Sequence, residues 1–214
     1  MGIPVMILGK SGSGKTTSLR NINPEDSFLI QPVRKSLPFR NKWQPYDNST
    51  QQGQIIQSDN AGFIGQVITK ARSMGRNKVI VDDFQYIMAN EFMNRSAETG
   101  FTKFTEIAKH VWELILTATN ADPDVIVYFL SHTETNDAGE VKAKTIGKLL
   151  DEKITLEGLF TIVLGTSIDN GQYLFATQSS GMDTFKSPMG MFEERFIEND
   201  LNTVDQTIRE YEGI

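Results

Sequence analysis

A glycine-rich stretch near the start of the chain sharply limits the possible folds. It reads Gly9-Lys10-Ser11-Gly12-Ser13-Gly14-Lys15-Thr16 and matches the pattern G-x-x-x-x-G-K-[ST] at every fixed position. The apolar run 3–8 precedes it, and residues 17–20 open a predicted helix after it. Glycines let the backbone curl so that successive N–H groups point at phosphate oxygens. The sequence therefore predicts a strand, a phosphate-binding loop and a helix in succession.

The motif predicts a role for each of its polar residues. We expect Lys15 to reach the β- and γ-phosphates and the hydroxyl of Thr16 to ligate Mg²⁺. ATP and Mg²⁺ are the expected cofactors. The predicted nucleotide-binding residues are Gly9, Lys10, Ser11, Gly12, Ser13, Gly14, Lys15, Thr16 and Thr17.

A second acidic element follows a short apolar run, Val79-Ile80-Val81, and consists of Asp82 and Asp83. A phosphate loop needs a carboxylate at the end of another strand to hold the magnesium shell, and Asp82 is the predicted one. Asp83 is predicted to orient or deprotonate the attacking water. The alternative is that Asp83 only caps the helix that begins at Phe84.

The apolar run 125–130 ends in polar residues, Ser131-His132-Thr133-Glu134. In phosphate-loop ATPases of the RecA-like and AAA kinds, a polar residue at this place senses the γ-phosphate. Ser131, His132 or Thr133 could do so by hydrogen bonding, or the histidine could be a loop residue satisfied by backbone. The predicted catalytic set is Lys15, Asp82, Asp83 and His132.

Short apolar runs alternate with helical periods along the chain, and this predicts one α/β domain, residues 1–214, with a mainly parallel sheet. The last third predicts an antiparallel hairpin around Asp169-Asn170-Gly171, and residues 187–214 are predicted to be a tail with a short helix at 203–211. The long stretch 31–60 has no predicted element. Strands are expected at 3–8, 27–30, 79–81, 125–130, 159–164 and 172–177, and helix faces at Phe63, Val67, Ile68, Ala71; Phe84, Ile87, Met88, Phe92; and Phe104, Ile107, Ala108, Val111, Trp112, Ile115.

Composition excludes several kinds of protein. The chain has no cysteine and two histidines, which rules out a disulfide framework, a thiolate metal site and a His-rich centre. No apolar run approaches the roughly 20 residues of a membrane span, and the first residues lack a secretory signal, so we expect a cytoplasmic protein with no membrane partner. The net charge of −6 argues against a protein that coats nucleic acid over its whole surface.

Taken together, these motifs resemble a phage family of RecA-like phosphate-loop ATPases, the phage nucleotide-binding proteins that include the Sak-type single-strand annealing proteins. The stretches that carry the resemblance are GKSGSGKTTSLRNI, VIVDDFQYIMANEFM, FTEIAKHVWELI, VIVYFLSHTE, KTIGKLLDEKITLEG and SPMGMFE. The resemblance implies a RecA-like core that binds single-stranded DNA, forms a homo-oligomer and hydrolyses or senses ATP in the host cytoplasm. A single-strand-binding protein is a possible partner. RecA-like recombinases usually carry a catalytic glutamate after the second strand, and residues 28–34 contain no acid.

Two segments are candidates for DNA contact. In the first, Arg34, Lys35, Arg40 and Lys42 are interleaved with aromatic residues, namely Phe39, Trp43 and Tyr46, which offers phosphate contacts and stacking faces together. The alternative is a flap whose aromatic residues pack on the domain. The second segment, 134–148, carries Lys142, Lys144 and Lys148, and its alternative is a solvated β-hairpin leading into a helix at Gly147.

Lys186 and Arg195 flank the SPMGMFE stretch. Ring-forming ATPases complete each site with a cation from a neighbouring subunit, and either residue could serve, or be a surface cation without a role.

The predicted function is an ATP-dependent DNA recombination or annealing protein. A motor or helicase loader that acts with a protein partner shares the same core. A small-molecule kinase is a third possibility, although the segment after Leu130 has lysines and none of the arginines typical of a kinase lid.

Overall fold

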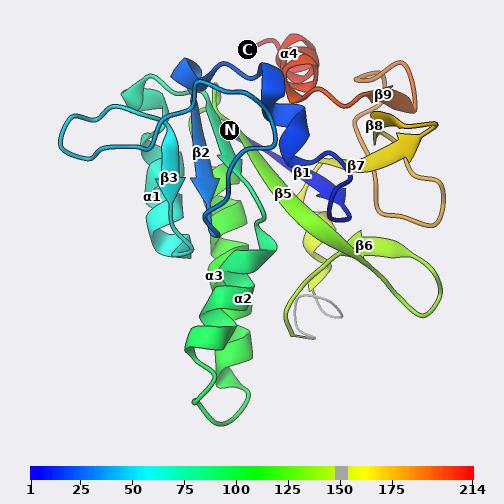
Figure 1. Ribbon diagram of the computed structural model, residues 1–214. Coiled ribbons are helices and arrows are strands. Elements are labelled where there is room, and N and C mark those ends of the chain that lie inside the picture. Colours follow the sequence, from blue (N-terminus) through cyan, green and yellow to red (C-terminus); the bar gives the residue numbers. More distant parts are fainter. Residues whose placement is uncertain (148–153) are drawn as a thin grey trace.

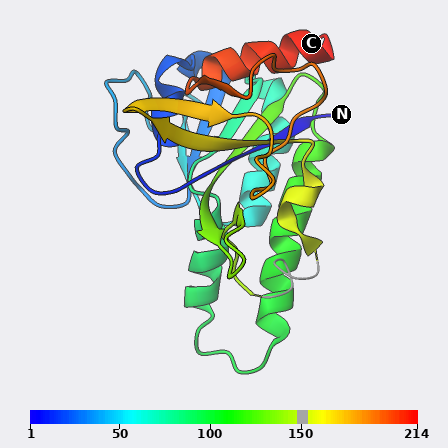
Figure 2. The ribbon, with the colours of Figure 1, turned by 90° about the vertical axis from the view of Figure 1, so that its right-hand side faces the viewer.

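The computed structural model describes residues 1–147 and 154–214. One large sheet forms the centre of an α/β fold, and helices cover both of its faces (Figure 1 and Figure 2). The strands are β1 (Ile3–Gly9), β2 (Ser27–Gln31), β3 (Ile55–Gln57), β4 (Lys78–Val81), β5 (Ile126–Thr135), β6 (Val141–Ala143), β7 (Ile162–Asp169), β8 (Gln172–Ala176) and β9 (Phe196–Glu198). Their order is β3-β2-β4-β5-β1-β7-β8-β9, and β6 pairs with the end of β5.

The strands from β3 to β7 in this order are parallel, so their carboxyl ends meet at one edge of the sheet. At that edge Gly9, the last residue of β1, is the register partner of His132 on β5. Val81, the last residue of β4, is the register partner of Phe129, which is also on β5. This register brings the phosphate loop, the acidic pair and the polar end of β5 together.

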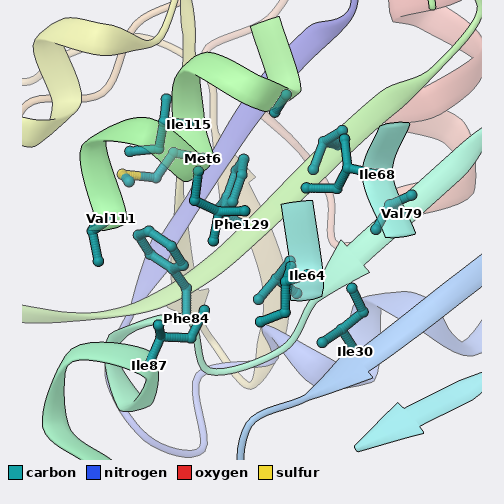
Figure 3. Close-up of a cluster of buried hydrophobic side chains, with 14 of the residues drawn as sticks. Met6, Ile30, Ile64, Ile68, Val79, Phe84, Ile87, Val111, Ile115 and Phe129 are labelled. Carbon is teal, nitrogen blue, oxygen red and sulfur yellow. The ribbon is translucent and has the colours of Figure 1, made fainter. Parts of the chain in front are cut away.

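Alternate side chains of the central strands point to opposite faces, and both faces are buried, which explains the continuous apolar runs. Met6 and Leu8 pack with three helices on one face, whereas Val5 and Ile7 pack with a fourth helix on the other. Figure 3 shows the first cluster, in which Met6 lies among side chains of the covering helices. The helices are α1 (Ala61–Lys70), α2 (Gln85–Asn94) and α3 (Thr102–Thr119) on the first face and α4 (Leu201–Glu212) on the second.

The helices predicted from apolar spacing are confirmed as α1, α2 and α3, but two aromatic residues do not lie on the buried faces. Phe63 is 41% exposed and Trp112 is 37% exposed. Trp112 follows Val111, which faces the core, and one residue turns a helix by about 100°. No helix in the described part of the chain is long and apolar enough to cross a membrane.

Short elements differ most from the sequence prediction. The helix after the phosphate loop is a 3₁₀ helix of six residues, η1 (Thr16–Asn21). It ends before Asn23, which is extended, the backbone that Pro24 favours for the residue preceding it. The stretch 31–60, predicted to be irregular, contains β3, an edge strand of three residues. Residues 1–147 and 154–214 also contain the 3₁₀ turns η2 (Pro24–Asp26), η3 (Arg72–Met74) and η5 (Leu156–Leu159).

The predicted antiparallel hairpin is confirmed as β7 and β8. Asn170 and Gly171 both have positive φ, 48° and 80°, which is the backbone of a tight two-residue hairpin turn. The first strand begins at Ile162 rather than at residue 159, because η5 occupies 156–159. The α/β fold with a mainly parallel sheet and a C-terminal antiparallel hairpin is therefore as predicted.

Much of the segment predicted to be a tail packs on the domain. β9 pairs with β8, and the helix expected at 203–211 runs from Leu201 to Glu212. The Asp200 carboxylate accepts a hydrogen bond from the Asn202 N–H at 2.9 Å and caps this helix. Leu201, Val204 and Ile208 are fully buried.

A buried polar network fixes α4 to the sheet. Asp205, which is 3% exposed, accepts hydrogen bonds from the Tyr128 hydroxyl and from Arg209 Nε, both at 2.8 Å. Lys78 Nζ lies 3.6 Å from the same carboxylate and 3.0 Å from Asp26. These contacts lie at the opposite end of the strands from the phosphate loop, since Lys78 begins β4.

Candidate functional site

The phosphate loop joins β1 to η1 at the carboxyl edge of the sheet. Gly12 and Gly14 have φ of 76° and 100°, a left-handed backbone that glycine adopts without steric cost. The loop borders a cavity of about 260 Å³. The predicted nucleotide-binding residues that line it are Ser11, Gly12, Gly14, Lys15, Thr16 and Thr17, while Gly9, Lys10 and Ser13 form the base of the loop.

Lys15 is folded over the loop. Its Nζ donates hydrogen bonds to the carbonyl of Gly9 at 2.9 Å and to that of Lys10 at 3.0 Å. Burial lowers the Lys15 pKa to about 8, against the opposing effect of Asp82. The loop carbonyls therefore hold a desolvated cation at the wall of the cavity.

Thr166 on β7 anchors the loop from the neighbouring strand. Its hydroxyl lies 2.6 Å from the Ser13 hydroxyl and donates to the Leu8 carbonyl at 3.2 Å. Ser13 in turn donates to the Lys10 carbonyl at 2.6 Å. Thr166 could not be predicted from the sequence, because only the pairing of β7 with β1 brings it to the loop.

Thr16 and Asp82 form the expected pair. The Thr16 hydroxyl donates to the Asp82 carboxylate at 3.0 and 3.2 Å. Burial raises the Asp82 pKa, and the hydrogen bond from Thr16 and the charges of Lys35 and Lys15 act in the opposite direction. A hydroxyl and a buried carboxylate are oxygen ligands that suit Mg²⁺. Residues 1–147 and 154–214 contain no group of three or more His, Asp or Glu that could hold a metal ion.

Asp83 has a backbone that a non-glycine residue rarely adopts, with φ of 62°. Its carboxylate lies 3.1 Å from His132 Nε2 and forms an ion pair with Lys35. The first turn of α2 shows no side-chain cap among the described residues. The alternative in which Asp83 only caps a helix is therefore not what the structure shows, because the carboxylate faces the cavity.

His132 is the residue at the end of β5 that borders the cavity. Burial lowers its pKa to about 4, and Lys15, Lys35 and Lys144 add to the effect. The ring is therefore neutral near pH 7, and Nε2–H can donate to Asp83. Of the other sensor candidates, Ser131 is buried and donates to the Gln85 side chain at 3.3 Å, and Thr133 is paired with Ala143 of β6.

Gln85 is a second residue that the sequence analysis missed. Its side-chain oxygen accepts hydrogen bonds from the His132 N–H at 3.1 Å and from the Ser131 hydroxyl. Gln85 therefore links the start of α2 to the end of β5. The sequence signal for Gln85 was its position, two residues after Asp83, where it is the first residue of α2.

The four cationic residues predicted for DNA contact in the first segment lie at different places in the structure. Lys35 enters the phosphate-loop cavity, where its Nζ contacts Asp83 and lies 5.5 Å from the centre of the Tyr86 ring. Arg34 borders a different cavity, and Arg40 and Lys42 are exposed.

The aromatic residues of that segment also separate. Trp43 is 5% exposed and belongs to a core cluster, and the partly buried Phe39 packs against the same cluster, so the flap alternative describes these two residues. The ring of Tyr46 meets Phe28 edge-on, with ring centroids 5.6 Å apart.

The second segment predicted for DNA contact forms the hairpin of β5 and β6. A β-hairpin was the alternative predicted for this segment. Lys142 Nζ lies 3.4 Å from Glu134, and Lys144 is exposed. Lys148 lies outside the described residues. Lys186 and Arg195 are exposed and do not line the phosphate-loop cavity, and the Arg195 guanidinium lies over the Phe196 ring at 5.1 Å.

Comparison with known proteins gives no family. No family model matches the chain, and no curated protein matches it. Among solved structures, a KaiC-like protein from the hyperthermophilic archaeon Pyrococcus horikoshii OT3 is similar over 81% of this chain and 76% of its own, with 14% identity and a TM-score of 0.44. At this identity and TM-score, the likeness assigns neither a family nor an activity.

Proposed function

We propose that this protein binds MgATP at the phosphate loop and hydrolyses it. The observation that carries the proposal is that one cavity is lined by six residues of the phosphate-loop segment, by the Thr16–Asp82 pair and by Asp83 with His132. Each group has the chemistry that phosphoryl transfer to water needs, namely phosphate contacts, a metal ligand and a base.

The loop supplies the phosphate contacts. Lys15 lines the cavity with a desolvated ammonium group, and the backbone N–H groups of a glycine-rich loop favour anions. Thr16 and Asp82 would hold Mg²⁺, which neutralises charge on the β- and γ-oxygens when it is bound. The buried Asp82 fits that role, because a divalent cation offsets the cost of its burial.

Asp83 is proposed as the base. The attacking water forms a bond to the γ-phosphorus as the bond to the β–γ bridging oxygen breaks, and the water proton passes to Asp83. His132 donates Nε2–H to one oxygen of this carboxylate, and Lys35 contacts the other. Asp83 thus takes the place of the glutamate that is missing after β2.

We also propose that the ATPase is RecA-like and acts on single-stranded DNA as a homo-oligomer, in recombination or annealing. The support is the resemblance of the sequence motifs to the phage family, together with the position of β5 between β1 and β4. The hairpin with Lys142 and Lys144 continues directly from His132, so it could link nucleotide state to DNA contact. Lys186 and Arg195 remain candidates for the cation supplied to a neighbouring subunit.

The test of MgATP binding uses a fluorescent ATP analogue, with and without Mg²⁺. Lys15→Ala is expected to lose binding, and Asp82→Asn to lose the Mg²⁺ dependence, whereas Lys42→Ala, an exposed lysine away from the cavity, is the matched control. Circular dichroism verifies that the variants fold. Unchanged affinity in folded Lys15→Ala, or unchanged Mg²⁺ dependence in Asp82→Asn, contradicts the proposal.

A further inference from the structure

A second and larger cavity lies beside the phosphate-loop cavity. Its volume is about 820 Å³, within the range of roughly 300–1,000 Å³ typical of small-molecule sites. Gln31, the last residue of β2, and Gln57, the last residue of β3, line it, so it opens at the same carboxyl edge of the sheet. Ligands of parallel α/β sheets bind outside the carboxyl ends of the strands. Lys35 and Ser36 border both cavities.

The charge of the larger cavity favours an anion. Arg34 and Lys35 line it, and none of the described residues that line it is acidic. Lys35 is paired with Asp83, whereas Arg34 is exposed at the cavity wall. A guanidinium group can bind a phosphate through two parallel hydrogen bonds.

The rest of the wall suits a nucleobase. Phe63 lines the cavity although it is 41% exposed, which gives the first turn of α1 an open aromatic face. Tyr46 lines it as well, and its edge-on contact with Phe28 fixes the ring. The side-chain amides of Gln57 and Asn48 offer both donors and acceptors, the groups that read the edge of a base.

We propose that this cavity binds a second nucleotide unit, with its phosphate on Arg34 and its base against Phe63. The unit could belong to a single strand of DNA or be a free nucleoside monophosphate, since both present the same base and phosphate. The strand form of this site rests on the proposed action on single-stranded DNA, whereas the free-nucleotide form goes beyond it, and neither form requires ATP hydrolysis.

The experiment measures two probes against protein whose phosphate loop is saturated with MgATPγS. A fluorescein-labelled single strand of deoxythymidylate is followed by anisotropy, and thymidine monophosphate by calorimetry. The variants are Arg34→Ala and Phe63→Ala, with Phe63→Trp to restore an aromatic face. Arg72→Ala, at an exposed arginine of η3 outside both cavities, and Phe101→Ala, 86% exposed beyond α2, are the matched controls.

We expect Phe63→Ala to weaken binding by about 5- to 150-fold, the loss of one stacked base, and Phe63→Trp to retain it. Arg34→Ala should reduce the slope of log affinity against log salt by about 0.7 for the strand. Binding of the strand alone identifies a strand site, and binding of the monophosphate identifies a free-nucleotide site.

Three results would overturn the proposal: no binding of either probe, binding that ignores both cavity variants, and equal losses in the control variants. A separate titration measures the binding of MgATPγS to the phosphate loop. Failure of MgATPγS to bind counts against the proposed ATPase and not against this cavity. All four alanine positions are exposed, so their variants are expected to fold.

Discussion

Substituting Gly9 by alanine tests whether the packing of β7 sets the position of the phosphate loop. Gly9 has no space for a side chain, because a Cβ built there would lie 1.7 Å from the Thr166 hydroxyl and 2.5 Å from the Ser13 hydroxyl. Contacts under 3.0 Å are essentially never seen for real Cβ atoms. The strand or the hydroxyl must therefore shift, although both hydroxyls are engaged in the contacts that hold the loop.

Overpacking of this kind costs about 1–3 kcal/mol of unfolding free energy. For a chain of this length it should lower the melting temperature by about 2–12 °C. Thr166→Ala removes the 1.7 Å contact and leaves the added Cβ 3.0 Å from the Cβ of residue 166 and 2.5 Å from the Ser13 hydroxyl. The cost of Gly9→Ala should therefore fall in the Thr166→Ala background, with a coupling energy of about 0.5–3 kcal/mol.

The assay is urea unfolding of the two single variants, the double variant and the wild type. Gly158→Ala is the control, because an added Cβ at this exposed glycine meets nothing within 4 Å. ATP-analogue binding to the folded variants reports the loop itself. Additive costs in the double variant, or a Gly9→Ala cost no larger than that of Gly158→Ala, would refute the steric reasoning.

Three further predictions concern other parts of the molecule. The His132 ring should titrate near pH 4 by NMR. Because its pKa is lowered from 6.5, the contribution of His132 to stability should fall as the pH drops from about 6.5 to 4. A titration midpoint at pH 6.5 would show that the ring is not buried among cations. Asp205→Ala should cost about 3–5 kcal/mol in urea unfolding and Tyr128→Phe only about 1, and similar costs would mean that the Asp205 charge is not what anchors α4. Replacing Lys142 and Lys144 by alanine should lower the salt slope of single-strand binding by about 0.7 per lost phosphate contact, whereas an unchanged slope places the DNA elsewhere.

The sequence was sufficient for the parts of the site that depend on local pattern. The phosphate loop is a contiguous motif, and Asp82 follows an apolar strand, so both could be located without knowledge of the sheet order. The place of Lys35 in the site could not be predicted, because no nearby residue in the sequence shows that the chain after β2 returns to Asp83. Thr166 depends on a strand pairing across more than 150 residues, which no local pattern encodes.

The fold shows the same division between local and long-range information. The buried strands and amphipathic helices were predicted, because their periods are visible in short windows. β3 was missed because three residues are too short for a period, and its place is set by pairing with β2. The packing of α4 was missed because Asp205 and Arg209 look like surface charges until Tyr128 and Lys78 are seen beside them.

We propose that Asp83 is the base for hydrolysis of MgATP in the phosphate-loop cavity. It is tested most directly by phosphate release from MgATP, with and without single-stranded DNA, by the wild type, Asp83→Asn and the control Asp137→Asn, an exposed acid on the β5–β6 turn. We expect Mg²⁺-dependent phosphate release by the wild type and the control, and a release rate lower by about 10²- to 10⁴-fold in Asp83→Asn, with MgATP affinity retained. Release by Asp83→Asn at the wild-type rate, or no release by the wild type under either condition, would contradict it.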